Sequence, residues 1–270
     1  MKRVGVILVL VLTMFSGSSQ AARKYRTLNQ WRGRNVAFLG DSMTDERHIG
    51  TTKNYWQYLD EMLGLNPMVY GVNGHQWTGV MEQARKLAEA GEKTDAIVIF
   101  AGTNDYNAGV PIGRWYDTVS CDVEVADGRY EWRERRTPSI DESTFKGRMN
   151  IVLSFLKDTF PEAQIILLTP IHRAYARFSP SNVQPDESYA NSAGLFFDSY
   201  VDAVKQAAGV WAVAVLDLNG DCGLYPLSRS HSRYFHDADT DMLHPNADGH
   251  RRIAETLAYR MLTLPSNFAY

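Results

Sequence analysis

The chain has 270 residues, of which 44% are hydrophobic and 22% are charged. This is the composition of a folded globular protein and not of a disordered or fibrous one, and the length suits one large α/β domain or two small ones. Because 28 basic residues stand against 31 acidic ones, the net charge is −3 and offers no basic field, so we expect no nucleic-acid partner.

The first 21 residues predict a secretory signal peptide. Lys2 and Arg3 form a charged start, residues 4–15 are almost continuously apolar, and Ser19 and Ala21 place small residues where a signal peptidase cleaves. The apolar run is shorter than the roughly 20 residues of a membrane-spanning helix. We therefore expect a secreted or periplasmic protein whose mature chain has no stable membrane insertion. An uncleaved membrane anchor is the alternative.

Strand and helix patterns alternate along the rest of the chain. Short apolar runs bounded by turn residues predict strands at residues 35–39, 67–72, 95–101, 164–169 and 211–218. Apolar residues at helical spacing predict helices at residues 55–65, 80–90, 144–160, 187–208 and 247–264. Strand and helix alternation predicts a parallel sheet with helices on both faces. We expect one domain over residues 22–270, a three-layer α/β/α sandwich with a five-stranded parallel, flavodoxin-like sheet.

Two segments do not fit this alternation, residues 111–141 and residues 171–187. Each directly follows a predicted strand, and the carboxyl ends of parallel strands carry the binding site of such sheets. We therefore expect both segments to form walls of a substrate site. Four aromatic side chains could stack on sugar rings there, although packing in the core or in loops is the simpler role for each. They are Trp77, Tyr106, Trp115 and Trp132.

Cys121 and Cys222 are the only cysteines of the chain. An exported protein can join such a pair in one disulfide, but a fold built on disulfides has more cysteines in a shorter chain. The sequence leaves open whether these two are bonded to each other or are separate thiols.

Four short motifs follow the predicted strands or lie near the end of the chain. They are Gly40-Asp41-Ser42, Gly71-Val72-Asn73-Gly74, Gly102-Thr103-Asn104-Asp105 and Asp241-Met242-Leu243-His244. Taken singly, each has a structural explanation, because serine and aspartate after a strand commonly cap helices or shape turns. We expect this simpler role for Asp41 and Asp105.

Three of these residues have the chemistry of a serine hydrolase. A serine hydroxyl becomes a nucleophile only beside a base, and histidine is the side chain whose ordinary pKa lies near neutral pH. Ser42 and His244 could form this pair. Asp241, three residues before the histidine, could hold the second ring nitrogen and so fix the tautomer.

The four motifs, in this order and after these strands, resemble those of the SGNH or GDSL family of esterases and acylhydrolases, and the resemblance covers nearly the whole mature chain. It implies that Ser42 is the nucleophile, His244 the base and Asp241 the acid that orients it. It also implies an oxyanion hole formed by the backbone of Ser42 with Gly74 and Asn104, although Gly71 is an alternative to Gly74. The resemblance implies neither a metal nor a cofactor.

The C-terminal part of the chain allows a metal site as an alternative. Six possible ligands lie there, namely His231, His236, Asp237, Asp239, Asp241 and His244. The run from Asp237 begins like a calcium loop, but the sixth position is Met242 instead of glycine and the twelfth is Asp248 instead of glutamate. We therefore expect no metal here. His172 could line the substrate pocket, and a solvated loop histidine is the simpler expectation.

Together these observations predict a serine esterase that hydrolyses short-chain, above all acetyl, esters of carbohydrates through an acyl-enzyme. The preference for carbohydrate depends on the export signal, the absence of a long apolar lid and the aromatic residues near the expected site. Such a protein would be a secreted bacterial carbohydrate esterase acting on a small ester or a polysaccharide. A short-chain lipid or lysophospholipid esterase is one alternative, and a non-catalytic carbohydrate-binding protein of the same fold is another. The sequence leaves the acyl length, the sugar and the oligomeric state open.

Overall fold

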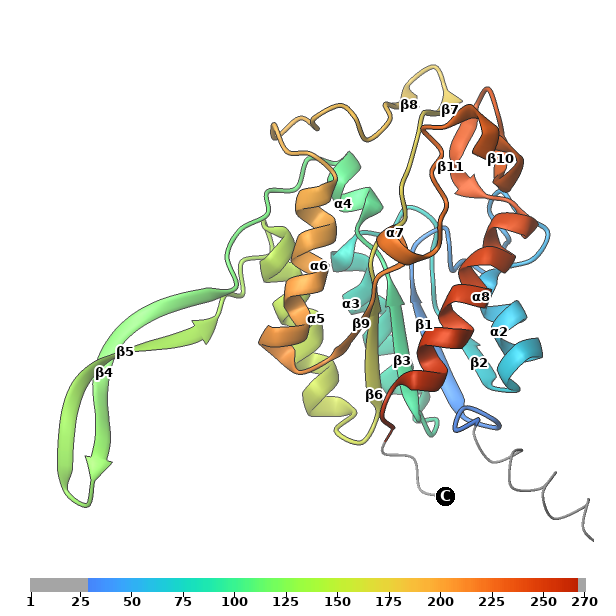
Figure 1. The fold of residues 1–270 in the computed structure, drawn as a ribbon. Helices are drawn as coiled ribbons and strands as arrows, with labels where there is room; N and C mark the ends of the chain where they lie inside the picture. Colours follow the sequence, from blue (N-terminus) through green and yellow to red (C-terminus); the bar gives the residue numbers. More distant parts are fainter. Residues whose placement is uncertain (1–28, 267–270) are drawn as a thin grey trace, which may run out of the picture.

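The computed structural model describes residues 29–266 and shows a three-layer α/β/α sandwich (Figure 1). Five parallel strands form the central sheet in the order β2-β1-β3-β6-β9. They are β1 (Asn35–Gly40), β2 (Asn66–Val69), β3 (Ala96–Phe100), β6 (Gln164–Leu168) and β9 (Ala214–Leu216). The strand order reverses between β1 and β3, and a sheet of this kind forms its crevice at that point. The predicted fold class is confirmed.

Helices cover both faces of the sheet. One face carries α3 (Trp77–Ala90), α5 (Phe145–Thr159) and α6 (Asp198–Trp211), and the other carries α2 (Tyr55–Leu63) and α8 (Ala247–Thr263). Successive side chains of a strand point to opposite faces. In β1, therefore, Val36 and Phe38 belong to the core under α2 and α8, whereas Ala37 and Leu39 belong to the core under α3, α5 and α6.

The helix predicted over residues 187–208 is wrong at its start, because α6 begins only at Asp198. The preceding residues form a loop organised by Asn191. Its side-chain oxygen accepts hydrogen bonds from the backbone N–H groups of Ala193 and Leu195, at 3.0 and 3.1 Å. A polar side chain that bonds nearby backbone in this way competes with helix formation, and the apolar spacing does not report it. The strand predicted at 211–218 is correspondingly shorter, because α6 extends to Trp211.

A small antiparallel sheet, which the strand and helix pattern did not predict, lies above the carboxyl ends of the parallel strands (Figure 1). Its strands are β7 (Ala176–Ser179), β8 (Asn182–Gln184), β10 (Phe235–Asp237) and β11 (Asp241–Pro245), in the order β10-β11-β7-β8. The remaining short helices are α4 (Thr103–Asn107), α7 (Leu218–Asp221) and the 3-10 helix Arg229–Tyr234. The sheet joins segment 171–187 to the strand that carries His244.

Residues 111–141 do not form a wall of the site, so that prediction is wrong. They form a two-stranded hairpin, here called the arm, of β4 (Tyr116–Ala126) and β5 (Arg129–Pro138), which projects away from the sandwich (Figure 1). Asp127 and Gly128 connect the two strands, and Gly128 has a φ of 66°. An Asp-Gly pair between two strand-like runs is a strong hairpin signal that the sequence does contain.

Three further expectations concern export and cysteine pairing. The predicted signal peptide lies outside the described residues. Within residues 29–266, no helix is both long and apolar enough to span a bilayer. Cys121 on β4 is half-buried, Cys222 after α7 is buried, and both are free thiols, so the two cysteines do not form a disulfide in this structure.

Candidate active site

The structure brings Ser42, His244 and Asp241 together at the carboxyl end of β1. The hydroxyl oxygen of Ser42 lies 3.0 Å from Nε2 of His244. On the other side of the ring, Nδ1 lies 2.9 and 3.1 Å from the two carboxylate oxygens of Asp241. All three side chains are buried. Their distances are those of a hydrogen-bonded serine, histidine and aspartate relay.

The three-residue spacing between Asp241 and His244 is explained by a local turn. The carboxylate of Asp241 also accepts the backbone N–H groups of Leu243 and His244, at 3.2 and 3.0 Å. The same side chain therefore fixes the backbone and the ring of His244. The Phe178 ring packs against this imidazole with centroids 5.4 Å apart. Asp241 is thus held in a position where it can orient the base.

Gly40 and Gly71 allow close packing beneath Ser42. A Cβ on Gly40, whose φ is +152°, would lie 2.2 Å from the carbonyl oxygen of Phe100, and one on Gly71 would lie 2.5 Å from Cβ of Thr44. Neither position has room for a side chain. Gly71 therefore packs against Thr44, whereas Gly74, with a φ of +82° and open space around it, lines the pocket at Ser42.

Three residues that line the pocket, Ser42, Gly74 and Asn104, carry N–H donors. Within residues 29–266, the backbone N–H groups of Ser42 and Gly74 donate no hydrogen bond to protein. The Asn104 amide, which follows β3, donates one N–H to the carbonyl of His75 at 3.1 Å and has a second N–H available. This arrangement matches an oxyanion hole, in which donors without a protein partner bind the negative charge that develops on a substrate oxygen. The roles assigned to these residues stay predictions.

Asp45, which the sequence analysis did not single out, holds the loop of Gly74. Its carboxylate accepts the backbone N–H of Asn73 at 2.7 Å and makes a bidentate ion pair with Arg47, whose Nε and Nη2 groups donate to Oδ1 and Oδ2. Although burial by itself would raise it, the hydrogen bonds from Arg47 keep the pKa of Asp45 below its ordinary value. The carboxylate thus stays ionised and fixes the backbone directly before Gly74. Sequence alone gives no signal for a contact between positions 28 residues apart.

Two other buried polar side chains stabilise the turns that carry the site residues. Gln83 of α3 bonds both the N–H and the carbonyl of Gly40, each at 2.8 Å, and so fixes the strand end before Ser42. Arg173 donates to the carbonyl and hydroxyl of Thr103, at 3.2 and 3.0 Å, and to the side chain of Gln184 at 2.7 Å. Burial lowers the pKa of Arg173 to about 10, so it stays a cation at neutral pH. This cation joins the turn of Asn104 to segment 171–187.

Asp41 and Asp105 shape backbone turns, as expected for them. Asp41 accepts the backbone N–H of Met43 at 3.1 Å. Asp105 accepts the N–H of Trp77, the first residue of α3, at 3.1 Å and pairs with Arg148 at 2.9 Å. Burial raises the pKa of Asp41 to about 7 and, despite the opposing effect of Arg148, that of Asp105 to about 6. Both acids are therefore structural groups that titrate near neutral pH.

The raised pKa of Asp41 predicts a pH-dependent stability that Asp41→Asn removes. Its pKa rises from 3.8 to about 7 on folding, so the folded chain holds a proton that the unfolded chain releases. The stabilisation is complete below the lower pKa and is lost as the pH rises through the upper one. Asparagine keeps the acceptor for Met43 and cannot ionise. The quantity to compare is the free energy of unfolding of the variant minus that of the wild type, measured by urea denaturation. We expect this difference to rise by roughly 1 kcal/mol or more from about pH 5 to about pH 8. A constant difference across that range would contradict the assignment.

The pocket over Ser42 has a volume of about 330 Å³, and its wall combines polar side chains with a larger apolar surface. Its lining residues are Ser42, Ile49, Asn73, Gly74, Asn104, Phe178, Asn182, Gln184, Leu243 and His244. Segment 171–187 contributes Phe178, Asn182 and Gln184, as predicted for a wall of the site. The pocket is therefore mixed, with amide side chains beside the apolar side chains of Ile49, Phe178 and Leu243.

The four predicted aromatic candidates do not line this pocket, so their expected place near the site is wrong. Trp77 and Tyr106 are buried in the core, Trp115 packs half-buried against the same core, and Trp132 lies on the arm with 70% of its surface exposed. The aromatic ring at the site is that of Phe178, which a short strand beyond the predicted sheet places there.

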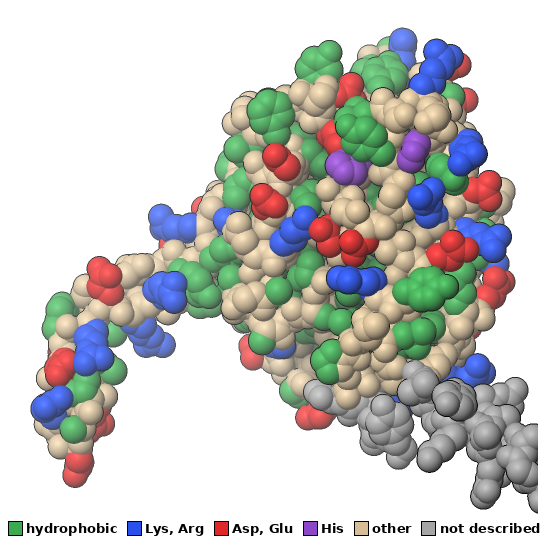
Figure 2. Space-filling model, viewed as in Figure 1, with side chains coloured by type: hydrophobic (Ala, Val, Ile, Leu, Met, Phe, Trp, Pro, Cys, Tyr) green, Lys and Arg blue, Asp and Glu red, His purple; other side chains and the backbone are tan. Residues whose placement is uncertain are grey.

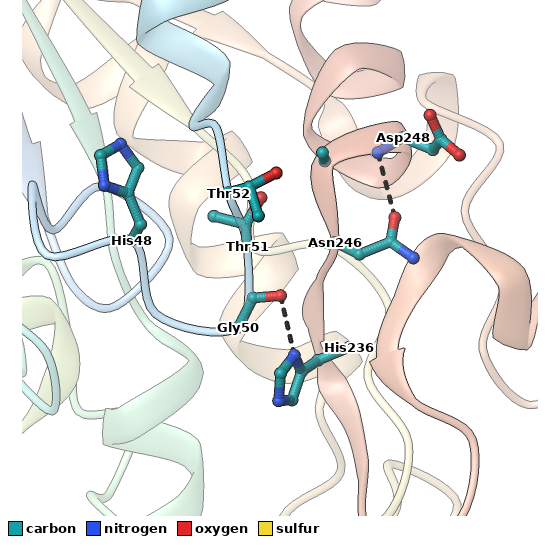
Figure 3. A pocket seen from close by; sticks show the side chains of 8 residues that line it. His48, Gly50, Thr51, Thr52, His236, Asn246 and Asp248 are labelled. Atoms are coloured by element: carbon teal, nitrogen blue, oxygen red, sulfur yellow. Dashed lines mark hydrogen bonds between the residues drawn. The ribbon is translucent and has the colours of Figure 1, made fainter.

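A second pocket lies on the other side of loop 48–52 (Figure 3). Ile49 of this loop faces the Ser42 pocket, whereas His48, Thr51 and Thr52 line the second one with His236 and Asn246. Nδ1 of His236 lies 3.1 Å from the carbonyl oxygen of Gly50. A Cβ on Gly50 would lie 2.6 Å from Cβ of His244, so this loop packs directly against the histidine of the site.

Within the described chain, five of the six residues considered as metal ligands, all except Asp239, have side-chain hydrogen bonds to other groups. In the part of the chain that the structure describes, no three His, Cys, Asp or Glu side chains are grouped as metal ligands. The Asp237 carboxylate accepts the backbone N–H groups of Asp239 and Thr240, at 2.9 and 2.8 Å. His172 lies in a loop with 29% of its side chain exposed, as expected, and its Nδ1 lies 2.5 Å from Oε1 of Glu187. It lines a neighbouring pocket and not that of Ser42.

Comparison with known families agrees with this geometry. The sequence profile of the GDSL-like lipase/acylhydrolase family matches residues 38–252. The chain belongs to this family. The match extends from β1 into α8 and includes all four motifs, so the GDSL-like chain is an ester hydrolase by family. The comparison with curated proteins finds no match.

Solved structures share the fold of this GDSL-like chain. A protein from Lactobacillus plantarum is 23% identical with a TM-score of 0.66, and the alignment covers 88% of this chain and 99% of that one. A possible lipase from Chitinophaga pinensis is also 23% identical, with a TM-score of 0.61 and coverage of 86% and 99%. A member of the lipolytic G-D-S-L family from Veillonella parvula is 15% identical, with a TM-score of 0.56 and coverage of 86% and 100%. At these identities the likeness shows the fold alone.

Proposed function

We propose that this GDSL-like hydrolase cleaves short acyl esters, above all acetyl esters of carbohydrates, through an acyl-enzyme on Ser42. The observation that carries the proposal is the Ser42 hydroxyl, 3.0 Å from His244 and in the lining of a small pocket. The Asp241 carboxylate behind the histidine and the unpaired N–H groups beside the serine supply the other two requirements of acyl transfer.

The reaction begins when Nε2 of His244 takes the proton from Ser42 as its oxygen attacks the ester carbonyl. Asp241 holds the proton on Nδ1 and stabilises the imidazolium that forms. The N–H groups of Ser42, Gly74 and Asn104 bind the negative oxygen of the tetrahedral intermediate. The C–O bond to the alcohol then breaks, and His244 gives its proton to the departing oxygen.

The second half of the reaction returns the free enzyme. Water gives a proton to His244 while its oxygen attacks the acyl carbon on Ser42. The same N–H groups bind the second oxyanion, and collapse of the intermediate breaks the bond to Ser42, which recovers its proton from His244. The products are a carboxylic acid and an alcohol. Every step uses residues already within hydrogen-bond reach of one another or of the pocket.

The lining of the two pockets favours a small acyl group on a hydroxyl-rich alcohol. At about 330 Å³ the Ser42 pocket lies at the small end of ligand sites, and amide groups from Asn73, Asn182 and Gln184 surround it. A long acyl chain would instead require an extended apolar channel. The second pocket, lined by Thr51, Thr52, His236 and Asn246, places hydroxyl, imidazole and amide groups close by. Sugar hydroxyls can hydrogen-bond with the threonine hydroxyls and the imidazole, whereas the Asn246 amide is already bonded to backbone groups of its own chain.

Hydrolysis of p-nitrophenyl esters of increasing acyl length tests the acyl part of the proposal. We expect kcat/KM to be highest for acetyl and to fall by about tenfold or more by the octanoyl ester, since each added methylene must fit into a pocket of about 330 Å³ beside the amide side chains that line it. Release of acetate from acetylated oligosaccharides, compared with fatty acid from a lysophospholipid, tests the alcohol part. A rise in kcat/KM with acyl length would favour the lipid esterase. Binding of sugar with no turnover of any ester would favour the non-catalytic alternative.

A further inference from the structure

Both faces of the arm are exposed to solvent. In residues 29–266, neither β4 nor β5 packs on another helix or strand beyond marginal contact, and no arm residue belongs to the two hydrophobic cores (Figure 2). An isolated two-stranded hairpin has marginal stability in water, because each strand has a neighbour on one side only and no layer covers it. We therefore expect another surface to pack on an arm of this length.

The sequence of β4 has the pattern of a strand with one buried face. From Thr118 to Val125 polar and apolar residues alternate strictly, and the apolar ones are Val119, Cys121, Val123 and Val125. Such alternation is typical of a strand whose one face is covered. In the structure, however, Val119 and Val123 are 53% and 41% exposed. The apolar face of the arm is thus formed but has no cover within the described chain.

The register of the arm gives this face a two-fold symmetric pattern. Val119 lies opposite Arg135, Cys121 opposite Arg133, and Val123 opposite Glu131. Residues directly opposite in an antiparallel pair share one face. A two-fold axis that runs across the strands at Cys121 places the position of Val119 over that of Val123, and the position of Arg135 over that of Glu131. A surface that is complementary to itself in this way is what a two-fold dimer requires.

We propose that the apolar face of the arm binds the same face of a second copy of this chain. In that dimer Val119 packs on the partner's Val123, Cys121 lies beside the partner's Cys121, and Arg135 pairs with the partner's Glu131. Arg133 lies at the axis and faces the partner's Arg133. In each chain its guanidinium lies 2.6 Å from Glu131, a carboxylate that also contacts Arg129 at 3.3 Å, so Glu131 is shared between the two chains in the dimer. The mutual contacts leave the opposite face, with Tyr130 and Trp132, in solvent.

The size of the arm sets the strength of the expected dimer. Eleven residues of β4 extend over about 36 Å, and a ribbon two strands wide buries roughly 1,000 Å² in total when two faces meet. This lies at the low end of specific interfaces. We therefore expect a dimer that dissociates on dilution into the nanomolar range and predominates at high micromolar concentration.

Charge reversal tests the contact between Arg135 and the partner's Glu131. By light scattering after size exclusion and by analytical ultracentrifugation, we expect Arg135→Glu and Glu131→Arg each to weaken the dimer by about tenfold or more, because like charges then face each other. The double variant restores opposite charges, and we expect it to recover most of the affinity. Val119→Asp should give a monomer. Circular dichroism and activity on p-nitrophenyl acetate check that each variant stays folded, since these residues belong to neither core.

Two controls fix the face and the centre of the interface. Trp132→Ala alters the opposite face and should leave the mass unchanged. A short bis-maleimide, to which each thiol adds across one double bond, should link two chains through Cys121 and fail with Cys121→Ser, because Cys222 is buried. A wild-type monomer at all concentrations, a dimer that survives Val119→Asp, or one lost in Trp132→Ala would overturn the proposal. A monomer retained on a polysaccharide gel through Trp132 would instead assign the arm to glycan binding.

Discussion

Ser42→Ala is expected to reduce kcat on p-nitrophenyl acetate by at least about a thousandfold, because it removes the atom that forms the acyl-enzyme. The Ser42 hydroxyl has one hydrogen-bond partner among residues 29–266, Nε2 of His244. Its loss opens no apolar cavity and leaves the Asp241 to His244 pair in place. We therefore expect a melting temperature within a few degrees of the wild type.

A fluorophosphonate probe gives an independent readout of the same prediction. The wild-type enzyme should gain the mass of one phosphonyl group on Ser42, and Ser42→Ala should gain none. Thr44→Ser is a useful matched control, because it alters a neighbouring hydroxyl residue of the same turn, whose oxygen contacts Tyr55 at 3.0 Å and not the site. If Ser42→Ala kept more than a few per cent of the activity, another group would be the nucleophile.

Asn104→Ala is expected to lower kcat by roughly a hundredfold to a thousandfold with little change in KM. The amide of Asn104 is placed to bind the substrate oxygen once that oxygen carries negative charge, and the ground-state ester gains less from it. The variant also loses the hydrogen bond to the His75 carbonyl at 3.1 Å. A small fall in melting temperature is therefore expected as well, on the scale of one hydrogen bond.

The two roles of Asn104 are separated by measuring kcat and thermal stability on the same preparation. Asn182→Ala removes another amide from the pocket wall, and we expect it to act mainly on KM. If Asn104→Ala were destabilised yet retained near-normal kcat per folded molecule, its role would be only to join α4 to the loop of Gly74. The oxyanion assignment would then have to move to the backbone N–H groups alone.

The order of strands and helices could be predicted from the sequence because it depends on local patterns. The apolar run of β3 and the helical stripe of α5 each carry their own periodicity, and alternation of the two dictates a parallel sheet. The motifs at Ser42, Asn104 and His244 also follow from residue type and order. Their spacing along the chain says which elements carry them, and the parallel sheet brings the first two to one edge.

Segments that depend on distant contacts could not be predicted in this way. The predicted start of α6 is wrong because Asn191 bonds nearby backbone, and the prediction of a wall over residues 111–141 is wrong although the Asp-Gly turn of the arm is visible in the sequence. The supporting residues Asp45, Gln83 and Arg173 were missed altogether. Each is a buried polar group whose partner lies far away in sequence, and no local pattern records such a pairing.

The sequence by itself therefore determined the fold class, the family and the order of the candidate catalytic residues, because these depend on periodicity and on motifs of few residues. Only the tertiary structure decided that Gly74 and not Gly71 faces the pocket, since Gly71 is pressed against Thr44. It likewise decided that Trp132 lies on the arm while Phe178 lies at the site. Both outcomes depend on how closely separate segments approach each other, and that distance is fixed by packing across the whole molecule.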